Sequence, residues 1–219
     1  MTDVAAFDFD GTLTDGGSVL EFLVSLRGRR AVLLATAGLA PRLAHGALVG
    51  GGAADQAKQR LFVRTLAGVP LAAVEEASDR FARHHLARHL RRHVQDRFDW
   101  HRRRGDRVVI VSASPEVYVR VAGDLLGADG VVATRLAVDD RGALTGHYQG
   151  ANCRGEEKLR RLREWIGDRG PDAGRLWAYG NSRGDLRMLH AADVGFNVGR
   201  LGRFGRLHSF AGLGAAPPG

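Results

Sequence analysis

Residues 4–12 read Val-Ala-Ala-Phe-Asp-Phe-Asp-Gly-Thr, an apolar strand pattern that ends in two carboxylates, Asp8 and Asp10, followed by Gly11 and Thr12. Because side chains alternate along a strand, residues two apart leave the same face, so both carboxylates can meet at the strand's carboxyl end. Open parallel sheets bind their ligands there. Converging carboxylates repel unless a cation lies between them or one holds a proton, so the pattern indicates a divalent metal, acid–base chemistry or both. A strand that runs into a polar turn has the same letters, and the rest of the chain must decide.

The composition is that of a globular protein, because 44% of the 219 residues are hydrophobic and 26% are charged. The single cysteine, Cys153, excludes an internal disulfide and fits a reducing compartment. The N-terminus has no signal-peptide pattern, and the longest apolar run, 31–40, is too short to span a bilayer. We therefore expect a cytoplasmic protein without a transmembrane segment.

The net charge is +8, and almost all of the cations are arginines, since Lys58 and Lys158 are the only lysines. A basic surface attracts anionic substrates or nucleic acid, so a nucleic-acid-binding protein is one alternative. The chain has no zinc-finger spacing, basic zipper or aromatic-basic RNA-binding strand. We therefore expect no nucleic-acid partner.

Strand-like apolar runs recur along the chain, and helix-length segments separate them from the second run onward. They lie at 4–9, 107–112, 131–134, 176–179 and 194–198. Alternation of this kind predicts βαβ units and a parallel sheet. Residues 15–99 carry a helical pattern far longer than an ordinary connection, so we predict a helical cap at 15–99 and a discontinuous core at 1–14 and 100–219.

Residues 136–150 alternate around Asp140-Arg141-Gly142 and predict a β-hairpin, and the glycine-rich last twenty residues predict a loose tail. Residues 82–104 show an apolar stripe at every fourth position and predict one helix. His85, His89 and His93 line up on it at helical spacing. Two histidines one turn apart can bind zinc, but no Glu accompanies them in a His-Glu-x-x-His pattern, and a solvated face is the alternative.

Four further polar residues fall at predicted strand or helix ends. Ser112 ends the second strand, Lys158 opens a helix, and Asn181 and Asp185 follow the strand Trp177-Ala178-Tyr179. Because the carboxyl ends of parallel strands meet at one edge, these groups are expected near Asp8 and Asp10.

With these residues, the chain resembles the haloacid dehalogenase superfamily of phosphotransferases. The motifs are Asp8-Phe9-Asp10-Gly11-Thr12, Val111-Ser112-Ala113-Ser114-Pro115, residues 150–158, and residues 180–185, in this order. The resemblance is closest to the branch that contains phosphoserine phosphatase. It implies a Rossmann-like α/β core, a parallel sheet with an all-helical cap inserted after the first motif, and hydrolysis of a small phosphorylated substrate.

The resemblance also implies a role for each motif residue. Asp8 would be the nucleophile that forms an aspartyl-phosphate, and Asp10 the general acid and base. Ser112 and Lys158 would hold the phosphoryl oxygens. Magnesium would be bound by Asp8, Asp10 through its carbonyl, and Asn181, with Asp185 contributing directly or through water.

The chain departs from the family in two places. Asn181 stands where an aspartate is usual, which lowers the charge of the metal site. In the phosphoserine phosphatases, a glutamate seven residues beyond the acid–base aspartate meets the substrate's ammonium group, and here that position is Gly17, with Glu21 four residues further on. We therefore expect a substrate other than phosphoserine, such as a sugar, lipid or other metabolite phosphate. The candidates for contact with this substrate are Gly11, Thr12 and Ala113 in the motifs, and Lys58 and Arg60 in the cap.

Residues 180–184 also read Gly-Asn-Ser-Arg-Gly, the G-x-S-x-G pattern of a serine esterase with Ser182 as nucleophile. That alternative demands an acid and then a histidine on later strands, and only one predicted strand follows Ser182. A requirement for magnesium distinguishes the two enzyme classes.

Overall fold

The computed structural model describes residues 2–39, 51–167, 174–199 and 211–212. The predicted loose tail, 200–219, lies outside the described residues except for 211–212. The strands are β1 (Val4–Phe7), β2 (Arg107–Pro115), β3 (Gly130–Thr134), β4 (Leu136–Val138), β5 (Leu144–Tyr148), β6 (Leu176–Gly180), β7 (Val194–Asn197) and β8 (Ala211–Gly212). The helices are α1 (Val19–Arg27), α2 (Arg29–Ala37), α4 (Gly51–Leu66), α5 (Leu71–His89), α6 (Arg92–Arg103), α7 (Glu116–Leu126), α8 (Glu156–Ile166) and α9 (Leu186–Ala191), with a 3₁₀ turn, η1 (Arg183–Asp185). Within this part of the chain, no helix is long and apolar enough to cross a membrane.

The core is a six-stranded sheet in the order β3-β2-β1-β6-β7-β8, and every neighbouring pair in it is parallel. The predicted α/β fold with a parallel sheet is therefore confirmed, and the two-residue β8 is an addition to the five predicted strands. Because β1 pairs with β2 on one side and with β6 on the other, the three motif-bearing strands are neighbours. Their carboxyl ends lie at the same edge.

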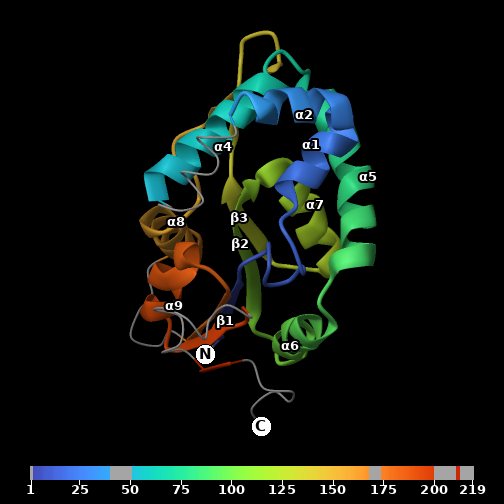
Figure 1. Ribbon diagram of the computed structural model, residues 1–219. Coiled ribbons are helices and arrows are strands. Elements are labelled where there is room, and N and C mark those ends of the chain that lie inside the picture. The colour runs from blue at the N-terminus through green and yellow to red at the C-terminus, as the bar shows by residue number, and fades with distance from the viewer. Residues whose placement is uncertain (1, 40–50, 168–173, 200–210, 213–219) are drawn as a thin grey trace.

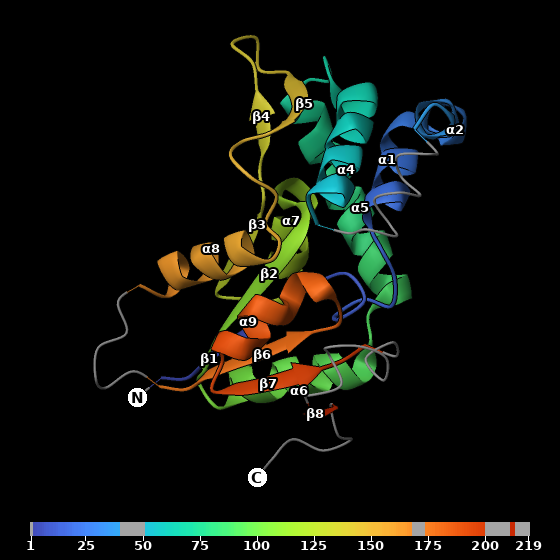
Figure 2. The ribbon, with the colours of Figure 1, turned by 60° about the vertical axis from the view of Figure 1, so that its left-hand side comes forward.

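Alternation along β1 divides the helices between the two faces of the sheet (Figure 2). Ala5 and Phe7 face the cluster that contains α6 and α7, whereas Val4 and Ala6 face the cluster that contains α8 and α9. A short, fully buried strand with both faces apolar is the pattern expected at the centre of a three-layer α/β domain.

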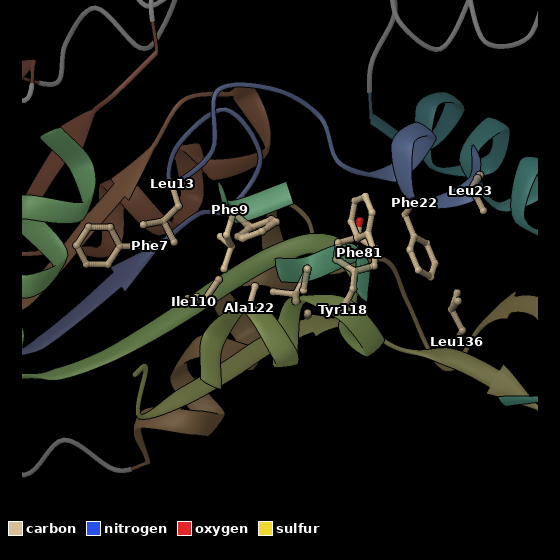
Figure 3. Close-up of a cluster of buried hydrophobic side chains, with 14 of the residues drawn as sticks. Phe7, Phe9, Leu13, Phe22, Leu23, Phe81, Ile110, Tyr118, Ala122 and Leu136 are labelled. Atoms are coloured by element: carbon tan, nitrogen blue, oxygen red, sulfur yellow. The ribbon is translucent and has the colours of Figure 1, made fainter. Parts of the chain in front are cut away.

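Helices α1, α2, α4 and α5 form the cap, which arches over the carboxyl edge of the sheet (Figure 1). The hydrophobic core continues from the sheet into it without a break, as Figure 3 shows. Phe22 of α1 and Phe81 of α5 pack on Tyr118 of α7, with ring centroids 4.7 and 5.1 Å apart. Burial of each such side chain contributes about 1.5–3 kcal/mol, so the cap is packed firmly on α7.

The prediction of one helix over 82–104 is wrong, because α5 ends at His89 and α6 begins at Arg92. Leu90 between them is extended, with φ −65° and ψ 124°, and forms a bridge with Thr14, so the two chain segments that enter and leave the cap pair with each other. Helix α6 lies against the sheet, where Phe98 packs on Phe7 at 5.2 Å between ring centroids. These contacts favour a cap boundary near residue 90 rather than at 99, and we propose that division.

The predicted hairpin over 136–150 is confirmed as the antiparallel pair β4–β5. It leaves the core and docks against α4 of the cap. Gly146 of β5, at φ +79°, allows the hairpin to lie this close to α4, because a Cβ at this position would lie 2.4 Å from Val63 Cα. Only glycine fits both the left-handed backbone and the contact.

Candidate active site

Asp8 directly follows β1 and is only 6% exposed. Its N–H donates to the Tyr179 carbonyl at 2.9 Å, which continues the β1–β6 ladder and fixes where the side chain leaves the sheet. Lys158 Nζ donates to Oδ1 at 2.6 Å, and Thr12 Oγ1 donates to Oδ2 at 3.0 Å. Burial raises the pKa of Asp8 to about 7, Asp185 adds to the rise, and Lys158 opposes it. The Asp8 carboxylate is thus held in one orientation and is largely shielded from solvent.

Lys158 lies near the start of α8 and is 2% exposed. Its ammonium group lies between two carboxylates, 2.6 Å from Asp8 Oδ1 and 2.5 Å from Asp185 Oδ1. Burial by itself would lower the pKa of Lys158, but Asp185 and Asp8 together hold it above its usual value. The lysine is therefore a permanent positive charge beside Asp8.

Asp10 is held at both carboxylate oxygens by groups from distant segments. The N–H of Ser18 donates to Oδ1 at 2.8 Å, and the Ser114 hydroxyl donates to Oδ2. The Ser18 hydroxyl in turn lies 2.8 Å from the hydroxyl of Tyr118. Asp10 therefore connects the chain entering the cap with the end of β2.

The sequence analysis did not identify Ser18 or Tyr118, and it named Ser114 within the second motif without a role. A signal for Ser114 existed, since it lies two residues beyond Ser112 on the same strand and side chains two apart share a face. No local pattern pointed to Ser18 or Tyr118, because their contact depends on how the cap docks on α7.

The end of β2 is fixed by a network of hydrogen bonds. Ser112 is 1% exposed, and its Oγ accepts the N–H of Ser114 at 3.0 Å. The Ala113 carbonyl accepts from Thr134 Oγ1 at 2.7 Å and from Lys58 Nζ at 2.8 Å. The predicted residues Ser112 and Ala113 thus lie on a stiff strand end.

Asn181 follows β6 and lies against the turn after β1. A Cβ on Gly11 would lie 2.0 Å from Asn181 Nδ2, and Gly11 has φ +77°, so glycine is required there on both counts. Asn181 Oδ1 is buried and has no hydrogen-bond partner among the described residues. A buried oxygen without a donor suits a metal ligand, and with the Asp8 carboxylate it makes the all-oxygen set that hard divalent cations prefer.

Asp185 is 1% exposed, and its carboxylate is taken up by protein donors. Besides Lys158 on Oδ1, its Oδ2 accepts the N–H groups of Asn181 at 3.2 Å and Ser182 at 2.9 Å, and the Ser182 hydroxyl at 2.8 Å. Ser182 Oγ also accepts the N–H of Gly184 at 3.2 Å, which caps the 3₁₀ turn η1. The Gly-Asn-Ser-Arg-Gly segment is therefore a capped turn in which the serine hydroxyl donates to Asp185.

Lys58 reaches the same edge from α4 of the cap. Besides the Ala113 carbonyl, its Nζ donates to Asn152 Oδ1 at 2.9 Å, and Asn152 Nδ2 donates to Asp55 Oδ1 at 2.7 Å. Burial lowers the pKa of Lys58 to about 8. Arg60, the other cap candidate, lies on the exposed surface of α4. The structure thus brings Lys58 to the core and leaves Arg60 outside.

Comparison with known proteins agrees with this arrangement of motifs. A family model described as haloacid dehalogenase-like hydrolase matches residues 5–190. Protein CicA of Caulobacter vibrioides is 37% identical over 193 residues, which cover 87% of this chain and 83% of that protein.

The solved structures that share the fold include the following two. A protein of unknown function from Bordetella pertussis Tohama I has a TM-score of 0.81 at 20% identity, over 99% of this chain and 100% of that chain. A substrate-bound phosphoserine phosphatase has a TM-score of 0.61 at 23% identity, over 90% of this chain and 86% of that chain. At these identities the likeness shows the fold alone.

Proposed function

The chain belongs to the haloacid dehalogenase-like hydrolase family, and on that premise we propose that it is a magnesium-dependent phosphatase that hydrolyses a phosphate monoester through an aspartyl-phosphate on Asp8. One observation carries the proposal. The buried Asp8 carboxylate is oriented by Lys158 Nζ at 2.6 Å, and Asp10 follows two residues later. A fixed nucleophile, a fixed cation and a second carboxylate are the groups that phosphoryl transfer to and from an aspartate requires.

The proposed reaction has two steps. In the first, an Asp8 oxygen attacks phosphorus, the bond between phosphorus and the leaving oxygen breaks, and Asp10 gives that oxygen a proton. In the second, water attacks phosphorus, Asp10 accepts its proton, and the bond to Asp8 breaks to release phosphate. Ser114 and Ser18 hold Asp10 at both oxygens, which supports a fixed position for proton transfer.

The negative charge of the phosphoryl group suggests roles for the remaining residues of the site. Lys158 and the Ser112 hydroxyl would hold the phosphoryl oxygens, whose negative charge must be stabilised in the transition state. Asp8, the main-chain carbonyl of Asp10 and Asn181 would hold magnesium, which supplies the positive charge that lets a phosphate dianion approach a carboxylate. We assign Asp185 a positioning role, since its oxygens hold Lys158 and the turn of Asn181.

Lys58 is the cap residue that we propose for substrate contact. Its ammonium group belongs to the cap yet donates to the Ala113 carbonyl at the end of β2. A cation at this junction favours an anionic substrate, in keeping with the net charge of +8.

A panel of phosphate monoesters, assayed with magnesium and with a chelator, tests the proposal. We expect hydrolysis of a generic aryl phosphate that the chelator abolishes and magnesium restores. Phosphate release that is unchanged by the chelator would contradict the proposed metal site. Hydrolysis of an aryl carboxylic ester in the chelator, without phosphatase activity, would favour the esterase alternative, although the Ser182 hydroxyl donates to Asp185.

The same panel tests the expectation about phosphoserine. Gly17 is exposed and carries no charge, and the Glu21 carboxylate is bonded to His85 at 2.8 Å. A substrate ammonium group left without a partner loses on the order of 2–5 kcal/mol, so we expect phosphoserine to fall well below the best ester in kcat/KM. If phosphoserine has the highest kcat/KM of the panel, this interpretation of Gly17 is wrong.

A substitution at Asn181 tests the metal site separately. Asn181→Asp adds a negative charge to a hard-oxygen site, so we expect half-maximal activity at a lower magnesium concentration. The magnesium titration should be compared with that of Asn197→Asp, which adds the same charge at the end of β7. An Asn181→Asp titration identical to the wild type would exclude residue 181 as a ligand.

A further inference from the structure

Two histidines and a glutamate converge where α1 meets α5 in the cap. Glu21 lies on α1, and His85 and His89 lie one turn apart on α5 with ring centroids 4.7 Å apart. Each residue offers one ligand atom within 4.8 Å of those of the other two. We propose that Glu21, His85 and His89 form a second metal site, for a divalent transition-metal ion such as zinc, separate from the phosphoryl site.

The spacing of the three side chains fits one ion. Glu21 Oε2 lies 2.8 Å from His85 Nδ1, and Glu21 Oε1 lies 3.4 Å from His89 Nε2. A tetrahedral zinc ion with bonds of about 2.0–2.1 Å separates neighbouring ligand atoms by roughly 3.3 Å. The two distances involve different oxygens of Glu21, and only one oxygen would bind a tetrahedral ion. Glu21 Oε1 already has this separation from His89 Nε2, and one ligand atom from each of the three residues lies within 4.8 Å of the other two.

His89 lies between two carboxylates, and this makes a cation favourable. Its Nδ1 is 2.7 Å from Asp15 Oδ1, while its Nε2 faces Glu21 Oε1. A neutral imidazole has one N–H, so a ring that donates to Asp15 turns a bare nitrogen toward Glu21. An ion bonded to both atoms removes that conflict, as a second ring proton also would, and the zinc count described below distinguishes the two. A metal-bound histidine that donates its other nitrogen to a carboxylate is also the usual outer-shell arrangement, and Asp15 would fill that role.

His85 is held rigidly beside Glu21. It is 2% exposed and packs between Phe9 and Phe81, with ring centroids 6.0 and 5.2 Å away. Its Nε2 is buried and has no hydrogen-bond partner among the described residues. The nitrogen that faces Glu21 is the other one, Nδ1, so the packing of the ring holds Nδ1 in one orientation toward the proposed ion.

The ligand types separate this site from the one at Asp8. Two imidazoles and one carboxylate suit zinc and its neighbours, whereas magnesium prefers oxygen ligands only. The position indicates what the ion would do. It would tie α1 to α5 and, through Asp15, to the segment whose Ser18 N–H holds Asp10.

The test counts zinc in the full-length protein after chelator treatment, in the presence of excess magnesium, by competition with a chromophoric chelator. Wild type is compared with Glu21→Gln and His89→Ala. The native Glu21 and His89 side chains are 49% and 29% exposed, so we expect both variants to fold. His84→Ala is the matched control, since His84 is an exposed histidine on the same helix bonded to Arg88. Thermal unfolding with and without zinc gives a readout that does not depend on activity.

We expect wild type and His84→Ala to bind one zinc ion more than Glu21→Gln and His89→Ala, and only the first two to gain thermal stability from zinc. Asp15→Asn should bind the ion about 10–100-fold more weakly, as loss of an outer-shell partner does. Equal zinc counts in all variants would overturn the proposal and leave ordinary histidine–carboxylate pairs. The zinc count does not depend on turnover, so it tests the second metal site separately from the proposed phosphatase activity.

Discussion

Asp8→Asn is expected to lower kcat toward a generic phosphate ester by on the order of 10⁴-fold or more, the scale of covalent-nucleophile replacements. An amide has the shape of the carboxylate but cannot attack phosphorus and leave again. The protein should remain folded, because the change removes a carboxylate whose charge burial disfavours, as its raised pKa indicates. Steady-state hydrolysis of an aryl phosphate, with thermal unfolding of the same sample, measures both effects.

Asp140→Asn serves as the matched control, since Asp140 is exposed in the turn of the β4–β5 hairpin. It should leave kcat within about twofold of the wild type, as exposed substitutions away from a site usually do little. An Asp8→Asn enzyme that keeps more than about a tenth of wild-type kcat would contradict the assignment of Asp8 as nucleophile, whatever the fate of the zinc site.

The sequence predicted the parts of the active site that depend on strand ends. Asp8, Ser112 and Asn181 follow apolar runs, and parallel strands deliver such residues to one edge of the sheet without any knowledge of side-chain packing. The pairing of β1 with both β2 and β6 brings these three ends together. Lys158 could be recognised because it opens a helix in a chain with only one other lysine.

The parts that escaped prediction depend on how the cap docks. Ser18 precedes α1, and the packing of α1 on α7 brings its N–H to the Asp10 carboxylate. The two residues are eight apart in the chain, and no local sequence pattern predicts their hydrogen bond. The break at Leu90 has the same origin, since the periodic apolar stripe continues across it while Thr14 pairs with its backbone. Periodicity reports which face of a helix is buried and is insensitive to a local change of backbone direction.

The histidine row illustrates this limit in the candidate metal site. His85 and His89 share a helix face, as their spacing predicts, but the acid missing from their own helix is Glu21, 64 residues earlier in the chain. A search for a Glu within the same helix could not find it. His93, the third member of the predicted row, lies beyond the break on α6.

Lys158→Met is expected to destabilise the protein by about 3–5 kcal/mol, the usual consequence of removing one partner from a buried ion pair. Lys158 is 2% exposed between Asp8 and Asp185, themselves 6% and 1% exposed. Methionine fills a similar volume, so the loss reports the two carboxylates left facing each other without a cation. Urea unfolding in the presence of a chelator measures it.

The double variant Lys158→Met/Asp185→Asn separates charge from packing. Removing the second carboxylate leaves Asp8 without a like charge beside it, so the double variant should be more stable than Lys158→Met alone, although Asp185 also caps the turn at Ser182. Lys58→Met is the matched control, because the hydrogen bonds of Lys58 within the described residues go to neutral oxygens, those of Ala113 and Asn152. A Lys158→Met protein no less stable than Lys58→Met would show that the Asp8–Lys158–Asp185 contacts contribute no net stability, and that the lysine is retained for its charge beside the phosphoryl group alone.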